Sequence, residues 1–436
     1  MSPFYKGLHH ALTSLYGDSF NLSSDNKIFE KVSAAFESVT KWLHRKKEFQ
    51  PEMLMEKEPQ TLINETFNVL KTPLENLSIE QDVPEELTRT LEENVFHFSG
   101  FKTYHELKEA SLLLKDEKGG FKSFDKFAQD VKRINERYNR NYLNAEYEFA
   151  VSSSQMAVKW KDYEKDGDRY NLQYRTAADD KVREEHAALH GITLPPSDKF
   201  WDKYYPPNGW RCRCTVVQVR KGKYDESDSD DACKAGEKAT THIGKNGSNK
   251  AAIFRFNPGK QEKIFPPKHP YYKVPEAVKK KIDEISEYRV VDTKNGFVRI
   301  HKLHGKKEKN ENIRIASYFA DKYGHEIDLI KIENNDTTPD TFNKTLGINQ
   351  EYKSNTTGSI SSIDSAIRSG KKQADHIVLE ILSDISMSDL SNAINDRVKR
   401  SANIQTLTIL KDNKDHTYTR EEMIADGFKI QSSDLN

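Results

Sequence analysis

The chain has 436 residues, and its 68 lysine and arginine residues balance 68 aspartate and glutamate residues. This length predicts about three domains of ordinary size, and the zero net charge excludes a strong overall attraction to nucleic acid, so any such attraction must be local. Basic segments at 302–309 and 397–400 are candidates for it. The polar first eleven residues do not fit a secretory signal, and no apolar run is long enough to span a membrane, so we expect no membrane partner.

Residues 1–150 are expected to form a helical N-terminal region. Apolar residues recur at helical spacing over 29–42 and again over 62–70. The segment 122–150 predicts a long amphipathic helix whose aromatic stripe faces a core or a subunit contact. The N-terminal third is therefore expected to be mainly α-helical.

The segment 151–221 contains a long ordered series of polar, aromatic and glycine residues. The series consists of Arg175, Thr176, Ala177, Asp180, Val182, Arg183, His186, Gly191, Phe200, Trp201, Pro206, Pro207, Asn208, Gly209, Trp210, Cys212, Arg213 and Cys214. It resembles the phage Mu protein F family, and residues 254–271 resemble the tail of the prophage members of that family. The resemblance implies a minor head protein that functions in capsid assembly, with phage portal and capsid proteins as partners. It also implies a location in the bacterial host cytoplasm and then in the virion.

Two histidines and two cysteines in this segment are possible zinc ligands. His186 and His190 have the i, i+4 spacing of one helix face, and Cys212 and Cys214 share one face of an extended segment. Structural zinc thiolates more often come as pairs separated by two residues, so the spacing favours a packing role, and we expect less than one zinc per chain. Cys212 and Cys214 are too close for a relaxed disulfide, and Cys233 makes the total odd, which is typical of a reducing cytoplasm.

Residues 222–290 are expected to contain a loop, the Mu F-like tail and a connector. The acidic run 225–231 and the Gly-, Lys- and Thr-rich run 236–250 predict a mobile loop. The charged segment 274–292 predicts a helical connector to the last part of the chain.

Residues 291–436 are expected to form a separate α/β domain. A helix over 312–323, ended by Gly324, is followed by strands over 325–332, 341–344 and 346–354, with a bulge at Gly347. A second helix runs from Ser361 or Ser362 to about Ala374, and a central strand follows over 376–382. The last two predicted elements are a helix containing Leu390 and Val398 and a strand over 404–410. The order αβββαβαβ matches the restriction-endonuclease-like fold. The predicted fold class is therefore multidomain: a mainly α-helical Mu F-like head domain followed by an α/β restriction-endonuclease-like C-terminal domain.

Asp340, Glu351 and Lys353 carry the clearest chemistry in this last part. Side chains alternate along a strand, so Glu351 and Lys353 share a face, and a turn brings Asp340 alongside. Two carboxylates suit Mg²⁺ or Mn²⁺, and Lys353 can orient an attacking water or offset charge on a phosphate. The alternative is a solvated strand face with an ordinary ion pair.

Pro339-Asp340 and Glu351-x-Lys353 resemble the PD-(D/E)xK nuclease signature. Together with Lys372, Gln373 and Ala374 they resemble the CdiA C-terminal tRNase toxin family over about the last third of the chain. This resemblance implies metal-dependent cleavage of tRNA and a cognate immunity protein. It also implies further catalytic residues at Glu311 and Gln373, although Glu308 competes with Glu311. The basic residues Lys371 and Lys372 are candidates for contact with the RNA backbone.

The two resemblances combine into one hypothesis. The chain is expected to be a prophage head morphogenesis protein that carries a nuclease toxin at its C-terminus. A head protein with an inactive or nucleic-acid-binding C-terminal module, and a nuclease that acts on DNA, are the alternatives. A neighbouring immunity gene would favour the toxin.

Overall fold

The structure, a computed structural model, describes residues 3–16, 27–244, 247–305, 308–333 and 337–435. It divides into two compact units, Met1–Ser286 (unit 1) and Glu287–Asn436 (unit 2). The expected boundary at 290/291 falls in the first strand of unit 2, whereas those at 150/151 and 221/222 fall inside unit 1. Among the described helices, none has both the length and the apolar character needed to cross a membrane.

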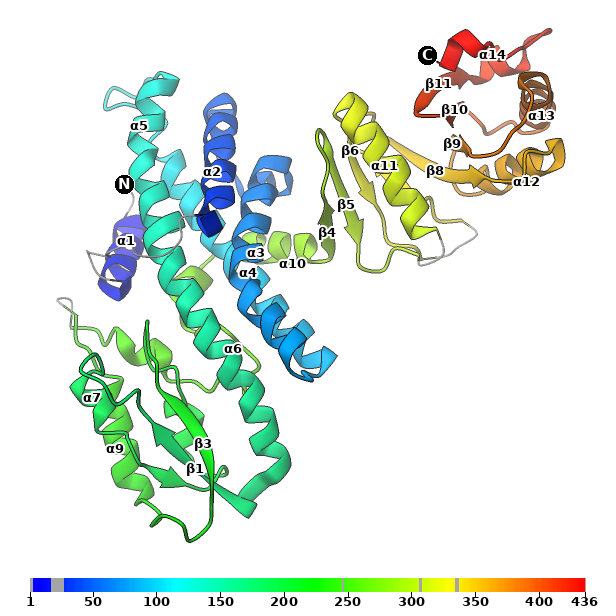
Figure 1. Cartoon of the computed structure of the whole chain (residues 1–436). Helices are drawn as coiled ribbons and strands as arrows, with labels where there is room; N and C mark the ends of the chain where they lie inside the picture. The colour runs from blue at the N-terminus through cyan, green and yellow to red at the C-terminus, as the bar shows by residue number, and fades with distance from the viewer. Residues whose placement is uncertain (1–2, 17–26, 245–246, 306–307, 334–336, 436) are drawn as a thin grey trace. The chain divides into compact units, whose positions relative to one another are not determined.

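Unit 1 joins long helices to a small antiparallel sheet (Figure 1). Its longer helices are α1 (Pro3–Tyr16), α2 (Lys27–Lys46), α3 (Lys57–Glu80), α4 (Glu85–Ser111), α5 (Phe124–Asn135), α6 (Leu143–Asp166), α9 (Ser229–Ala239) and α10 (Glu276–Ser286), with short helices α7 (Glu184–Ala187) and α8 (Phe200–Tyr204). The strands β1 (Tyr170–Arg175), β2 (Thr193–Leu194) and β3 (Thr215–Arg220) pair in the order β2-β1-β3. The helical N-terminal region is thus confirmed.

Helix α6 is shared by the larger and the smaller apolar core of unit 1. A π-helical segment (Glu136–Tyr142) joins α5 to α6, so the predicted helix over 122–150 is present and continues to Asp166. Phe149 packs in the larger core with the N-terminal helices, and Trp160 packs in the smaller core beside β1 and β3. The sheet is therefore anchored to the helical part by one long helix.

A buried ion pair lies inside the larger core. Lys102 of α4 and Glu146 of α6 have no exposed side-chain surface, and Lys102 Nζ donates a hydrogen bond to Glu146 Oε2. Glu146 Oε1 accepts a 2.7 Å hydrogen bond from the Tyr16 hydroxyl, whose oxygen also lies 2.9 Å from His269 Nε2. Both carboxylate oxygens of Glu146 therefore have partners, which is the condition under which a buried charge is tolerated. One turn away on α4, burial raises the pKa of Glu106 to about 8.

The predicted mobile loop over 222–250 is wrong in part, because residues 229–239 form helix α9. The Asp228 side chain caps the helix by accepting a 2.9 Å hydrogen bond from the Asp231 backbone nitrogen. Gly236 is buried in the helix, where an added Cβ would lie 2.4 Å from the Tyr204 ring of α8. The glycine that suggested a loop is therefore a position of close helix packing. Residues 245–246 of that segment lie outside the described residues.

Unit 2 forms, within its described residues, an eight-stranded sheet in the order β11-β10-β9-β8-β7-β6-β5-β4. The elements α11 (Lys309–Tyr323), β6 (Glu326–Leu329), β7 (Thr341–Asn343), β8 (Ile348–Asn355), α12 (Ile360–Gly370), β9 (His376–Ile381), α13 (Met387–Lys399) and β10 (Thr406–Lys411) follow the predicted order αβββαβαβ. Four elements were not predicted from the sequence. Strands β4 (Tyr288–Val291) and β5 (Phe297–His301) precede this series, and strand β11 (Lys414–Thr419) and helix α14 (Arg420–Ile424) follow it.

Strand β9 is covered on both faces, as its apolar run predicts. It pairs in parallel with β8 and β10. Val378 packs in a core with α11, and its neighbours Ile377 and Leu379 pack in the opposite core with α12 and α13. The domain therefore has the α/β class that was expected, with helices on both faces of the sheet.

Two local predictions in unit 2 are corrected. Gly347 lies at φ +70° in the turn that joins β7 to β8, rather than at a bulge. Helix α12 begins after Ser359, whose Oγ accepts a 3.2 Å hydrogen bond from the Ser362 backbone nitrogen, and it ends at Gly370. Residues 371–373 therefore form a turn after the helix rather than its last turn.

Candidate functional site

Three carboxylates of unit 2 meet where β7, β8 and α11 come together. Each of Glu308, Asp340 and Glu351 has an oxygen within 4.8 Å of an oxygen of the others. Asp340 directly precedes β7, Glu351 lies on β8, and Glu308 directly precedes α11. Asp340 and Glu351 are buried, whereas Glu308 is exposed. Carboxylate oxygens grouped in this way suit a hard divalent cation such as Mg²⁺ or Mn²⁺.

Reciprocal hydrogen bonds between backbone and side chain fix the two buried carboxylates. Thr341 pairs with Gln350, so the same register places Asp340 opposite Glu351. Asp340 Oδ2 accepts a 3.0 Å hydrogen bond from the Tyr352 backbone nitrogen, and the Asp340 nitrogen donates to Glu351 Oε2 at 3.1 Å. The pairing of β7 with β8 thus orients both groups.

Lys353 completes the group from the same face of β8. Its Nζ lies 2.6 Å from Glu351 Oε1 and 3.3 Å from Glu308 Oε2. Burial lowers the pKa of Lys353, but the nearby carboxylates, led by Glu351, outweigh burial and the net pKa is raised. The lysine therefore carries its charge in this environment.

The two buried carboxylates repel each other. Burial, followed by the charge of Asp340, raises the pKa of Glu351 to about 8, and burial also raises the pKa of Asp340. Lys353 offsets only part of this effect, because one ammonium faces several carboxylates. A divalent cation would favour the ionised form of both groups, so the donor set fits such an ion.

The other predicted site residues lie around this group. Glu311 lies in the first turn of α11 and is not part of the group of three carboxylates, whereas Glu308 is. Gln373 lies in the turn after α12, where its Nε2 donates a 3.2 Å hydrogen bond to the Thr338 carbonyl, two residues before Asp340. In the same turn Lys372 is exposed and Lys371 is half-buried, with its carbonyl accepting from Asn403 Nδ2 at 2.6 Å.

Two charged side chains of the basic segment 397–400 form ion pairs within unit 2. Arg397 and Arg400 both pair with Asp364 of α12. Of the segment 302–309, residues 306–307 lie outside the described residues, and Lys302 pairs with Glu287 at 3.7 Å.

His304 makes two contacts near this group that the sequence did not predict. Its Nδ1 lies 2.7 Å from the Ile330 carbonyl oxygen and therefore carries the proton, while its Nε2 accepts from Asn312 Nδ2 at 3.1 Å. These contacts tie the chain four residues before Glu308 to α11 and to the end of β6. A single histidine has no sequence signal for such a role.

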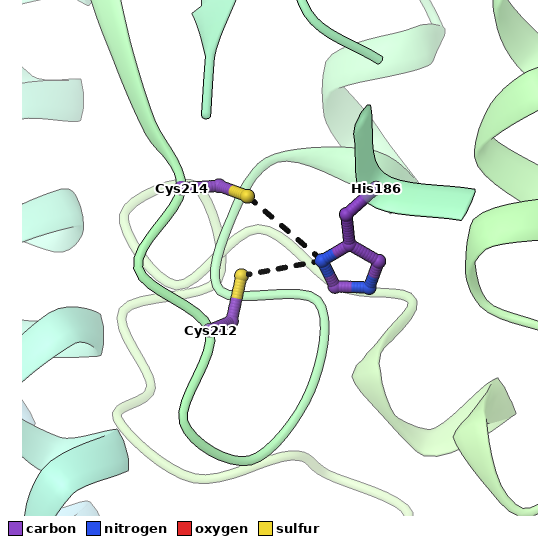
Figure 2. A group of neighbouring side chains, drawn as sticks. All are labelled: His186, Cys212 and Cys214. Atoms are coloured by element: carbon purple, nitrogen blue, oxygen red, sulfur yellow. Dashed lines mark hydrogen bonds between the residues drawn. The ribbon is translucent and has the colours of Figure 1, made fainter. Parts of the chain in front are cut away.

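A second group of possible ligands lies in unit 1. Cys212 Sγ is 3.7 Å and Cys214 Sγ is 3.8 Å from the same atom, His186 Nδ1, and all three side chains are buried (Figure 2). His190 is not part of this group, because α7 ends at Ala187 and the i, i+4 relation of one helix face is lost. Its Nδ1 lies 3.0 Å from Thr176 Oγ1 instead.

Comparisons with known proteins bear on the same part of unit 1. A family model described as "Phage Mu protein F like protein" matches residues 118–217. The "Putative capsid assembly protein F" of Escherichia phage Mu is 43% identical over 54 residues, which are 12% of this chain and 12% of that protein. The "Mu-like prophage FluMu F protein" of Haemophilus influenzae is 27% identical over 146 residues, which are 32% of this chain and 34% of that protein.

These similarities cover only part of each protein. The matched residues span about a third or less of the length of these curated relatives. No solved structure matches the chain. The series from Arg175 to Cys214 that resembled this family lies inside the matched segment. The chain therefore carries a phage Mu F-like domain in unit 1.

Proposed function

We propose that the chain is a phage or prophage head morphogenesis protein whose unit 2 is a metal-dependent nuclease. The first part of the proposal rests on the Mu F-like domain and on the name of the phage Mu relative, a putative capsid assembly protein. Portal and capsid proteins are then its partners, and it functions in the host cytoplasm and in the assembled head. Mass spectrometry of purified particles from the encoding phage tests this part: the chain should be found in them, and its absence would contradict a place in the head.

The nuclease rests on one observation, the meeting of Glu308, Asp340, Glu351 and Lys353 where the start of β7, strand β8 and the start of α11 come together. Asp340 and Glu351 would hold Mg²⁺ or Mn²⁺ with Glu308, and the ion would supply Lewis-acid chemistry for hydrolysis of a phosphodiester. Lys353 would stabilise negative charge that develops on the phosphate. Gln373 would hold the segment before Asp340 in place.

The proposed substrate is tRNA, and the proposed fold is the restriction-endonuclease-like one. Both follow from the PD-(D/E)xK and CdiA-like residues in the sequence and agree with the element order αβββαβαβ. Lys371 and Lys372 would contact the RNA backbone beside the carboxylates. A toxin of this kind would require a cognate immunity protein in the cell that makes it.

The test uses the purified full chain with total tRNA and, separately, with duplex DNA, in Mg²⁺ or Mn²⁺. We expect cleavage of tRNA that stops with a chelator, and a loss of at least ~100-fold in rate for Asp340→Asn, Glu351→Gln or Lys353→Ala, the scale of losing one electrostatic catalytic group. Lys309→Ala is the matched control, because Lys309 lies beside Glu308 but contributes at most one phosphate contact.

The outcomes separate the alternatives. Cleavage of DNA alone would replace tRNA by DNA as the substrate. If neither nucleic acid is cut, or if Glu351→Gln cuts as fast as the unaltered protein, the nuclease assignment to these residues fails. Circular dichroism of each variant shows whether a lost activity reflects a lost fold.

A further inference from the structure

We propose that His186, Cys212 and Cys214 bind one Zn²⁺ ion in unit 1, through His186 Nδ1 and the two cysteine Sγ atoms. The proposal is independent of the nuclease, because these residues belong to the Mu F-like domain. All three side chains are buried, and their possible ligand atoms lie within 4.8 Å of one another. Imidazole nitrogen and thiolate sulfur are the ligands that zinc prefers.

The distances match the edges of a zinc tetrahedron. Zn–S bonds of about 2.3 Å and Zn–N bonds of about 2.0–2.1 Å at tetrahedral angles separate nitrogen and sulfur by about 3.6 Å. The two sulfur atoms lie 3.7 and 3.8 Å from His186 Nδ1. Figure 2 shows both thiols directed at this one nitrogen from the same loop. The group therefore needs little rearrangement to hold the ion.

Hydrogen bonds account for part of this convergence. An imidazole nitrogen that accepts a hydrogen bond has a single lone pair, so His186 Nδ1 can accept from one thiol at a time. The two cysteine side chains also interact with each other, and Cys214 interacts with the Tyr174 side chain. A shared cation would bind the nitrogen and both sulfur atoms at once, with both thiols deprotonated.

The position in the fold gives the ion a structural purpose. The segment 176–214 between β1 and β3 contains only the short elements α7, β2 and α8. His186 lies in α7, and the two cysteines directly precede β3. Zinc would cross-link the two ends of this segment, and metal binding of this kind contributes directly to folding where regular structure is sparse.

Three protein ligands leave one position of a tetrahedral ion for another donor. The three residues line a pocket of about 560 Å³ together with Glu148, Arg183 and Arg211. A pocket of this size has room for water as the fourth ligand. Cys212 and Cys214 lack the spacing of a zinc-binding cysteine pair within one segment, but this site takes its ligands from two separate segments.

The experiment measures metal in the full chain, expressed with zinc in the medium and purified without a chelator. Elemental analysis should find about one zinc per chain, and His186→Ala, Cys212→Ser and Cys214→Ser should each remove most of it. The matched controls His190→Ala and Cys233→Ser should retain it, since neither residue belongs to the group. Glu351→Gln should also retain it, which excludes binding at the carboxylates of unit 2.

A second measurement does not depend on how the variants fold. Full-length protein prepared with Co²⁺ should show thiolate-to-cobalt charge transfer and the strong visible bands of a tetrahedral ion, unchanged in Cys233→Ser. The proposal is overturned if the folded, reduced chain contains no stoichiometric zinc and gives no cobalt–thiolate band. It is also overturned if zinc persists in a Cys212→Ser/Cys214→Ser variant, or if the native protein contains a disulfide between these cysteines.

Discussion

Replacing Lys102 by methionine should destabilise unit 1 by about 3–5 kcal/mol, the cost of removing one partner of a buried ion pair. Neither Lys102 nor Glu146 has exposed side-chain surface. In the variant, Glu146 Oε2 loses its donor, and only the Tyr16 hydroxyl on Oε1 remains among the contacts of that carboxylate described above. Glu146 must then stay ionised without a counter-charge or take up a proton, and both states cost free energy.

Tryptophan fluorescence during urea denaturation measures this change in unit 1 alone. The chain has four tryptophans, Trp42, Trp160, Trp201 and Trp210, and all belong to unit 1. Unfolding of unit 2 is therefore silent in this signal. The free energy of unfolding comes from linear extrapolation to zero denaturant.

Two controls define what the result means. Lys71→Met removes a partly exposed ion pair with Glu75, 2.8 Å long and one helical turn apart, and should cost less than about 1 kcal/mol. The double variant Lys102→Met/Glu146→Gln removes both charges and should recover part of the lost stability. The reasoning is refuted if Lys102→Met unfolds at the same urea concentration as the unaltered protein, or if the double variant recovers nothing.

Three further outcomes follow from particular contacts. Burial raises the pKa of Glu106 from 4.5 to about 8 on folding. Protonated Glu106 therefore contributes to the stability of unit 1, and this contribution is fully present below the unfolded pKa. The contribution, up to roughly 5 kcal/mol, is lost as the pH rises through about 8. In the Glu106→Gln variant, the free energy of unfolding should therefore fall less with pH, as measured by urea titrations at about pH 5, 7 and 9. The neighbouring charged residues Lys102, Glu109 and Glu146 are the same in both proteins. Gly236→Ala should cost about 1–3 kcal/mol by the fluorescence assay, because its Cβ would lie 2.4 Å from Tyr204. Glu308→Gln should slow nucleic-acid cleavage more than Glu311→Gln in matched rate assays, since only Glu308 joins the carboxylates; equal effects would contradict the grouping.

The order of elements in unit 2 was predictable because it depends on local patterns. The helical stripe of α11, the Gly324 stop and the unbroken apolar run of β9 each lie within one element. The missed strand β11 is polar and lies at the sheet edge, where one side has no strand partner and apolar alternation is weak. Strand β4 has four residues at the other edge, too few to show a period.

The choice between Glu308 and Glu311 was not available from the sequence. Both residues lie near a helix start, where an acidic residue is favoured for local reasons. Helix α11 begins at Lys309, so Glu308 directly precedes the helix and Glu311 lies in its first turn. Glu308 groups with Asp340 and Glu351, which are far from it in the chain, and no periodic pattern signals such a contact.

The expected pairing of His186 with His190 on one helix face was wrong for a related reason. The pairing of His186 with His190 assumed a helix that continues for a full turn, whereas α7 stops at Ala187. The convergence of His186 with the cysteines depends on how the segment 176–214 folds back to β3. Sequence spacing identifies ligands within one element more readily than ligands brought together by a loop.

The two candidate metal sites differ in chemistry, and this difference affects how a chelator experiment is interpreted. Unit 1 offers imidazole and thiolate groups that prefer zinc, whereas unit 2 offers carboxylates that prefer Mg²⁺ or Mn²⁺. A strong chelator can remove both ions, and loss of zinc could lower activity indirectly by unfolding unit 1. Mg²⁺ added alone cannot refill a site of two thiolates and an imidazole. Recovery of cleavage on Mg²⁺ alone would therefore assign the loss to unit 2, and recovery only with zinc would point to unit 1.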